Sequence, residues 1–95
     1  MNSNRGVHLE KEKRSELIVF GQTLQSIRKS RGFTQDELSL YSKVDRSFIS
    51  ELETGIKAAT FPTILSLTKA LNLSPSEFMK QYETNFSEYI KRHPL

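Results

Sequence analysis

The sequence predicts an all-helical protein in which five helices form one compact domain. Apolar residues recur at steps of three and four along much of the chain, which is the spacing of one helix face. A helix-start pattern recurs at short intervals, and no segment shows the alternation typical of a half-buried strand. A length of 95 residues fits a single domain. We therefore divide the chain into an N-terminal arm (1–15), a domain (16–83) and a tail (84–95).

The first helix is expected to run from about residue 17 to the residues before Gly32. Its apolar stripe consists of Leu17, Phe20, Leu24 and Ile27. Gly32 suits the left-handed backbone that ends many helices, and the basic residues before it favour a helix C-terminus. Residues 1–15 are polar and charged, so we expect a flexible charged arm there.

Capping residues mark the starts of the other four helices. Thr34, Asp45 and Ser74 each follow an apolar residue, as N-caps often do. Thr60 precedes a helix expected at about 61–71. The helices that begin near Thr34 and Asp45 are separated by a short turn, which predicts a helix-turn-helix over residues 34–54.

The last helix carries an aromatic and aliphatic stripe at helical spacing, formed by Phe78, Tyr82, Phe86, Tyr89 and Ile90. The helix either continues to about Lys91 or breaks near Thr84 and restarts. We expect the tail to take part in dimerisation through this stripe; the alternative is packing onto its own domain. The segment 93–95 is expected to be disordered.

Composition excludes several classes of function. The chain has no cysteine, which excludes disulfides and thiolate metal sites. It shows neither a membrane-spanning run nor a signal peptide, so we expect a cytoplasmic protein. No nucleophile–base set and no glycine-rich phosphate loop can be assembled. We therefore expect no enzyme. His8 and His93 are too far apart in sequence to suggest a metal site, so no cofactor is expected either.

Charge alone says little about a nucleic-acid partner. The net charge is +3, but residues 1–32 hold seven Lys/Arg against three Asp/Glu, whereas residues 33–59 hold three against five. The helix-turn-helix is therefore locally acidic. Its second helix, expected at 45–54, has Phe48, Ile49 and Leu52 on one side and a polar arc on the other. Arginine, serine and glutamate in that arc are side chains that can bond base edges.

Residues 18–79 resemble the XRE family of helix-turn-helix regulators, the group of lambda-repressor-like phage repressors and Cro proteins. The matching residues are Gly21, Leu24, Ile27, Arg28, Gly32, Thr34 to Leu38, Val44, Arg46, Ser47, Ile49, Leu52, Glu53, Gly55, Ala70, Leu71 and Phe78. The resemblance implies that 45–54 is the recognition helix and that the protein binds double-stranded DNA.

The resemblance also implies roles for individual residues. Arg46, Ser47 and Glu51 match base-reading positions, and Ser50 lies close to them. Gln35 matches a residue that bonds a DNA phosphate and braces the recognition helix, and Lys57 lies in a loop that follows the phosphate backbone. Arg28 and Glu53 match a partly buried ion pair. For Glu51, a salt bridge or a merely tolerated position is the alternative, because a carboxylate is repelled by DNA unless it accepts a proton donor.

Two residues depart from the family pattern. Lys43 stands where the turn usually has glycine in a left-handed conformation, at a cost of about 1 kcal/mol, and could reach a phosphate. Ser39 replaces a small alanine that lets the two helices approach.

We therefore expect a transcriptional regulator, of the repressor or restriction–modification controller type, that acts as a homodimer on a palindromic operator. The alternative is an antitoxin or protein-binding adaptor with the same fold. No membrane contact and no small-molecule ligand is expected.

Overall fold

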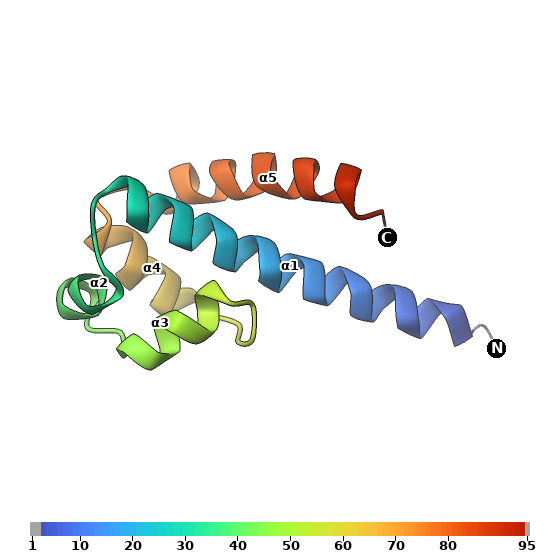
Figure 1. The fold of residues 1–95 in the computed structure, drawn as a ribbon, viewed down its shortest axis with the longest axis horizontal. Helices are drawn as coiled ribbons and strands as arrows, with labels where there is room; N and C mark the ends of the chain where they lie inside the picture. The colour runs from blue at the N-terminus through green and yellow to red at the C-terminus, as the bar shows by residue number, and fades with distance from the viewer. Residues whose placement is uncertain (1–2, 95) are drawn as a thin grey trace.

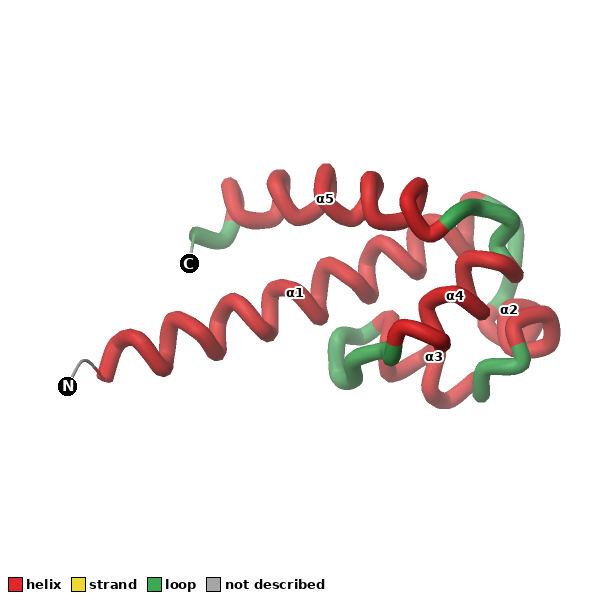
Figure 2. Tube along the Cα trace, turned by 180° about the vertical axis from the view of Figure 1, so that it is seen from behind, coloured by secondary structure: helices red, strands yellow, loops and turns green. Residues whose placement is uncertain are grey.

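The computed structural model describes the backbone of residues 3–94 and the side chains of residues 10–94. Its helices, in chain order, are α1 (Ser3–Ser30), α2 (Gln35–Ser42), α3 (Arg46–Glu53), α4 (Phe61–Ala70) and α5 (Pro75–Arg92). The described part of the chain contains no strand, as Figure 2 shows. The prediction of an all-helical fold with five helices is confirmed. None of the described helices is both long enough and apolar enough to cross a membrane.

Two long helices and three short ones form two parts of the molecule. α1 and α5 lie side by side and run in opposite directions, while α2, α3 and α4 gather at the C-terminal end of α1 (Figure 1). The N-terminal part of α1 extends beyond the rest of the fold. The short helices α2 and α3 are therefore held on one side of a long helical support.

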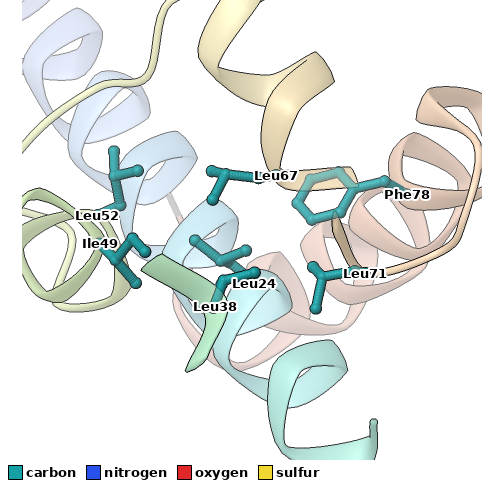
Figure 3. Close-up of a cluster of buried hydrophobic side chains, with 7 residues drawn as sticks. All are labelled: Leu24, Leu38, Ile49, Leu52, Leu67, Leu71 and Phe78. Carbon is teal, nitrogen blue, oxygen red and sulfur yellow. The ribbon is translucent and has the colours of Figure 1, made fainter. Parts of the chain in front are cut away.

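Every helix contributes to one apolar core. The fully buried side chains of the cluster in Figure 3 are Leu24, Leu38, Ile49, Leu52, Leu67, Leu71 and Phe78. Each of them is at most 1% exposed. Burial of such a side chain contributes about 1.5–3 kcal/mol. The short helices depend on this core, because isolated helices of eight to ten residues are not stable in water.

The predicted caps are largely present. Thr34 and Ser74 each form a capping box with the glutamate three residues later, and Thr60 accepts a hydrogen bond from the backbone N–H of Thr63. Asp45 is the exception: it stands at the N-cap position of α3, but its side chain makes no cap hydrogen bond. It accepts a hydrogen bond from the Ser47 hydroxyl instead.

Residues 3–15 of the expected flexible charged arm are helical, because α1 begins at Ser3, and the flexibility of the arm stays a prediction. Residues 1 and 2 lie outside the described part. Residues 10–13 alternate acidic and basic side chains with high helix propensity, and Glu10 lies three and four positions before Lys13 and Arg14, a spacing of opposite charges that favours a helix. A helix that is polar on all sides has no apolar stripe, so apolar periodicity does not detect it.

The aromatic stripe of α5 faces α1 in this structure. Phe78 is buried in the core, and its ring centre lies 5.3 Å from that of Phe20. Further along α5, the Asn85 side-chain amide donates to the Thr23 hydroxyl at 2.9 Å. Packing onto the same domain, which was the alternative, therefore accounts for Phe78. A role of the outer stripe in dimerisation stays a prediction.

The tail follows the first of the two alternatives for the last helix and departs from the disorder expected after it. α5 continues without a break to Arg92. His93, which was expected to be disordered, stacks on Tyr89 with ring centres 4.2 Å apart. Leu95 lies outside the described residues.

Gly21 permits the close approach of α1 and α3. A Cβ atom at this position would lie 2.3 Å from the Leu52 carbonyl oxygen and 2.7 Å from that of Glu53. These are backbone atoms, so the contact is relieved only if the two helices separate.

We expect Gly21→Ala to lower the free energy of unfolding by about 1–3 kcal/mol, as other overpacked sites do. Chemical denaturation monitored by circular dichroism measures this. Gln22→Ala, at the exposed neighbour of Gly21 on the same helix, serves as the control and should change stability by less than about 0.5 kcal/mol. Equal stability of Gly21→Ala and the wild type would contradict the close approach.

Candidate nucleic-acid interface

The turn between α2 and α3 has the backbone conformation that a glycine usually provides. Lys43 ends α2 with φ 65° and ψ 15°, in the left-handed region, and its N–H donates to the Ser39 carbonyl at 2.9 Å. Two serine hydroxyls brace the next residue: Ser39 donates to the Val44 carbonyl at 2.7 Å, and Ser42 accepts from the Val44 N–H at 3.1 Å. Ser39 is therefore more than a tolerated replacement for alanine, since it holds the strained turn.

The Glu53 carboxylate, at the end of α3, joins this helix to α1 and α2. Arg28 of α1 donates through Nε to Glu53 Oε2 at 2.6 Å and through Nη2 to Oε1 at 3.0 Å. The Gln35 amide, in the first residue of α2, donates to Oε1 at 2.9 Å, and the Gln25 amide lies 3.4 Å from the same oxygen. The side chains of Arg28 and Glu53 are only 8% and 1% exposed. The Arg28–Glu53 ion pair is thus present as a buried pair.

Arg28 also orients the chain entering α2. Its Nη1 donates to the Phe33 carbonyl at 2.7 Å, just before the Thr34 cap. The hydrogen bonds to Glu53 raise the pKa of the Arg28 guanidinium above its ordinary value and outweigh the opposing effect of burial. Arg28 therefore keeps its charge, and its bonds to Glu53 and Phe33 fix α3 relative to α1 and to the start of α2.

The helix α3 carries four of the residues expected to contact DNA. Ile49 and Leu52 are fully buried, so the opposite side of the helix faces outward. Arg46 and Ser47 are exposed at its N-terminal end, whereas Ser50 and Glu51 are half-buried further along. The exposed candidates are thus at the start of the helix.

Two of these residues have partners within the protein. Arg46 Nε lies 2.9 Å from Asp36 Oδ1 of α2, in an ion pair whose side chains are 61% and 79% exposed. The Ser47 hydroxyl donates to the Asp45 carboxylate. A ligand that contacts Arg46 or Ser47 must either leave these internal contacts in place or replace them.

The remaining candidates surround α3. Lys43 directly precedes the loop that enters α3, Lys57 lies in the loop that leaves it, and both are exposed. That second loop folds back: the Ile56 N–H donates to the Glu51 carbonyl at 3.0 Å. A cation therefore stands on each side of an eight-residue helix that is about 12 Å long. Gln35 is half-buried, with its amide directed to Glu53.

Sequence reasoning missed Asp36 and the bracing roles of Ser39 and Ser42. Asp36 and Arg46 are ten positions apart on different helices, so no periodicity within one helix connects them. Only the angle between α2 and α3 brings their first turns together. The serine contacts had a weak local signal, because Ser and Asn side chains often bond the backbone near turns.

Comparison with known proteins supplies an independent finding. A family model described as helix-turn-helix matches residues 24–78. Control protein C.BamHI of Bacillus amyloliquefaciens is 29% identical over 63 residues, which cover 65% of this chain and 78% of that protein.

Two solved structures are similar in fold and sequence. The restriction-modification controller protein C.AhdI from Aeromonas hydrophila has a TM-score of 0.64 and 35% identity, covering 65% of this chain and 94% of that chain. The restriction-modification controller protein C.Esp1396I, solved as a tetramer in complex with its natural 35 base-pair operator, has a TM-score of 0.71 and 25% identity. That match covers 75% of this chain and 93% of that chain.

The Glu53 carboxylate is the more sensitive half of the buried pair. In Glu53→Gln an amide N–H₂ group replaces one acceptor oxygen, so donors of Arg28 or Gln35 face a donor and the Arg28 charge loses its counter-ion. We expect a loss of about 3–5 kcal/mol in the free energy of unfolding, measured by urea denaturation. Glu51→Gln, a half-buried position on the same helix, is the control. If both variants lose the same small amount, Glu53 does not join the helices energetically.

The left-handed Lys43 carries a local strain that glycine would relieve. Lys43→Gly should raise the free energy of unfolding by about 0.5–1 kcal/mol in thermal or urea denaturation. Asn72, which also has a positive φ of 58°, provides the matched comparison. Because asparagine tolerates this conformation better than lysine, Asn72→Gly should gain less. A destabilised Lys43→Gly would mean that the lysine side chain itself supports the turn.

Proposed function

The chain belongs to the helix-turn-helix family whose model matches residues 24–78, and from this premise we propose that it is a sequence-specific DNA-binding transcriptional regulator. The observation that carries the proposal is the exposed start of α3, where Arg46 and Ser47 stand free of the core on a helix locked by Glu53. An arginine at such a position can pair with guanine O6 and N7 in the major groove, and serine can bond several base edges. The relatives are controller proteins, which favours a regulator over an enzyme.

The contacts divide into base reading and phosphate binding. We assign base reading to Arg46 and Ser47, with Ser50 and Glu51 further along the same helix. Lys43 and Lys57, on the two sides of α3, are assigned to phosphates. Gln35 is assigned to a phosphate and to the brace with Glu53. Phosphate contacts position the protein on DNA, and base contacts provide the specificity.

We propose that the protein acts as a homodimer on a palindromic operator, in the cytoplasm where the DNA lies. Few cations surround α3, so one copy offers little counterion release and should bind weakly. A dimer would place two α3 helices in successive major grooves about 34–36 Å apart. The tetramer of C.Esp1396I on its operator is consistent with assembly of this kind.

An apolar surface next to α3 is suited to this self-association. Leu17, Phe20, Met79 and Tyr82 line an open groove of about 240 Å³ between α1, α5 and the loop after α3. The neighbouring segment of the chain leaves Phe61 67% exposed. Met79 is also exposed, whereas Leu17, Phe20 and Tyr82 are half-buried, so apolar surface is available on the rim of this groove. This groove complements the outer stripe of α5 as a candidate for the dimer interface.

Selection of bound duplexes from random DNA by the full-length protein tests the proposed function. We expect recovered sites to contain two inverted half-sites whose centres are about one helical turn apart. Mobility shifts on those sites give the affinity, and sedimentation gives the number of copies bound. No preference over random duplex at moderate salt would reject sequence-specific regulation and favour the protein-binding adaptor.

Substitution of one base reader and one phosphate contact should have different effects. Arg46→Ala should reduce discrimination at particular base pairs by about 1–3 kcal/mol. Lys57→Ala should weaken binding to all duplexes alike and lower the slope of log affinity against log salt by about one. Affinities for the selected duplex and its single-base variants, measured across salt concentrations, check both expectations. An unchanged discrimination profile for Arg46→Ala would remove Arg46 from the base readers.

A further inference from the structure

An exposed carboxylate occupies one side of the Arg46 guanidinium. Asp36, in the first turn of α2, places Oδ1 2.9 Å from Arg46 Nε. Both side chains are largely exposed, at 79% and 61%. An exposed pair of this kind contributes little to folding stability, because solvent screens it and both side chains lose rotamer freedom. Its position on the proposed reading helix is therefore more informative than its strength.

The atoms used in the pair leave a defined part of the guanidinium for a ligand. Arginine has five N–H groups in a planar fork, of which Nε carries one and the two terminal nitrogens carry four. In the ion pair with Asp36, Nε is the guanidinium nitrogen closest to the carboxylate. The edge formed by the two terminal nitrogens still offers two parallel donors, which is the arrangement that pairs with guanine O6 and N7. The ion pair thus turns the Nε side of Arg46 toward Asp36 and leaves the edge of the terminal nitrogens for a base.

The backbone that carries the Asp36 carboxylate is itself held in place. Asp36 follows Gln35, whose amide donates to Glu53 at the far end of α3. The first turn of α2 is also closed by the Thr34–Glu37 capping box. The backbone of Asp36 is therefore rigid relative to α3, and a flexible arginine fixed against a rigid support has less rotamer freedom to lose on binding.

We propose that Asp36 is a positioning residue for DNA recognition, which holds Arg46 by Nε so that its terminal nitrogens read a guanine. The proposal rests on the proposed function of Arg46 as a base reader. It assigns Asp36 two effects of opposite sign. Its negative charge is repelled by phosphates and lowers affinity for every duplex, while its hold on Arg46 raises discrimination at one base pair.

Asp36→Asn tests these two effects together, because it removes the charge and keeps the size of the side chain. The measurement is the affinity of the full-length protein for a duplex selected from random DNA by the wild type, for variants of that duplex with the contacted guanine replaced, and for random duplex. We expect affinity for random duplex to stay equal or rise. Discrimination at the guanine should fall about fivefold to tenfold, which is part of the effect of a full bidentate pair.

Glu37→Gln is the matched control. It removes the same charge one position along the same helix turn, and glutamine can also complete the capping box with Thr34. This variant should raise affinity for all duplexes by a similar factor and leave discrimination at the guanine unchanged. Circular dichroism establishes that both variants are folded.

The possible results separate the inference from the function on which it rests. If Asp36→Asn changes affinity for all duplexes alike, with discrimination unchanged as in Glu37→Gln, the positioning role is overturned while the proposed function stands. If Arg46→Ala leaves discrimination unchanged, the reader role of Arg46 fails and the positioning role fails with it. In the Arg46→Ala background, Asp36→Asn should cause no further loss of discrimination at that base pair. A further loss would mean that Asp36 acts on DNA directly rather than through Arg46.

Discussion

The buried Glu53 carboxylate is the interaction on which the arrangement of this protein depends. Two hydrogen bonds from Arg28 and one from Gln35 connect the end of α3 to α1 and to the start of α2. A buried ion pair is weak evidence of stability, because desolvation of two charges offsets much of their attraction. Its value here is geometric: a planar guanidinium meets a carboxylate through two bonds in only a narrow range of orientations. The pair therefore sets the angle at which α3 leaves the core, and Gly21 supplies the space that the pair requires.

The structure gives several carboxylates of the acidic helix-turn-helix segment a partner within the protein. Of its carboxylates, Glu53 is neutralised by an arginine from α1, outside the segment, and Asp36 is paired with Arg46. Glu37 accepts from the Thr34 N–H in a capping box. These carboxylates thus hold backbone and cationic groups in place, although Asp36 and Glu37 remain exposed. In the proposed function, such a regulator would gain orientation of its contacting groups and lose general attraction to DNA, and assembly of more than one copy would supply the affinity.

The turn before α3 illustrates how the structure distributes strain. Lysine in a left-handed conformation is unfavourable because its Cβ crowds the backbone. The hydroxyls of Ser39 and Ser42 satisfy the backbone groups of Val44 on the far side of that residue. The cost is therefore local and compensated locally, and the exposed Lys43 side chain is left available beside α3. Fold and candidate interface share the same short segment.

The sequence by itself determined the helix count and the caps at Thr34, Thr60 and Ser74, because these depend on residues a few positions apart. The left-handed turn at Lys43 followed from the resemblance to a family. The sequence also pointed to Arg28 and Glu53, through resemblance to a family rather than through spacing. The helical start of α1 and the partner of Asp45 were not predicted correctly, since polar helices lack an apolar stripe and a short acidic side chain has competing local partners. Only the tertiary structure decided that Asp36 meets Arg46 and that Phe78 belongs to the core. Such contacts join separate helices, and the crossing angles that create them follow from packing of the whole core rather than from any local pattern.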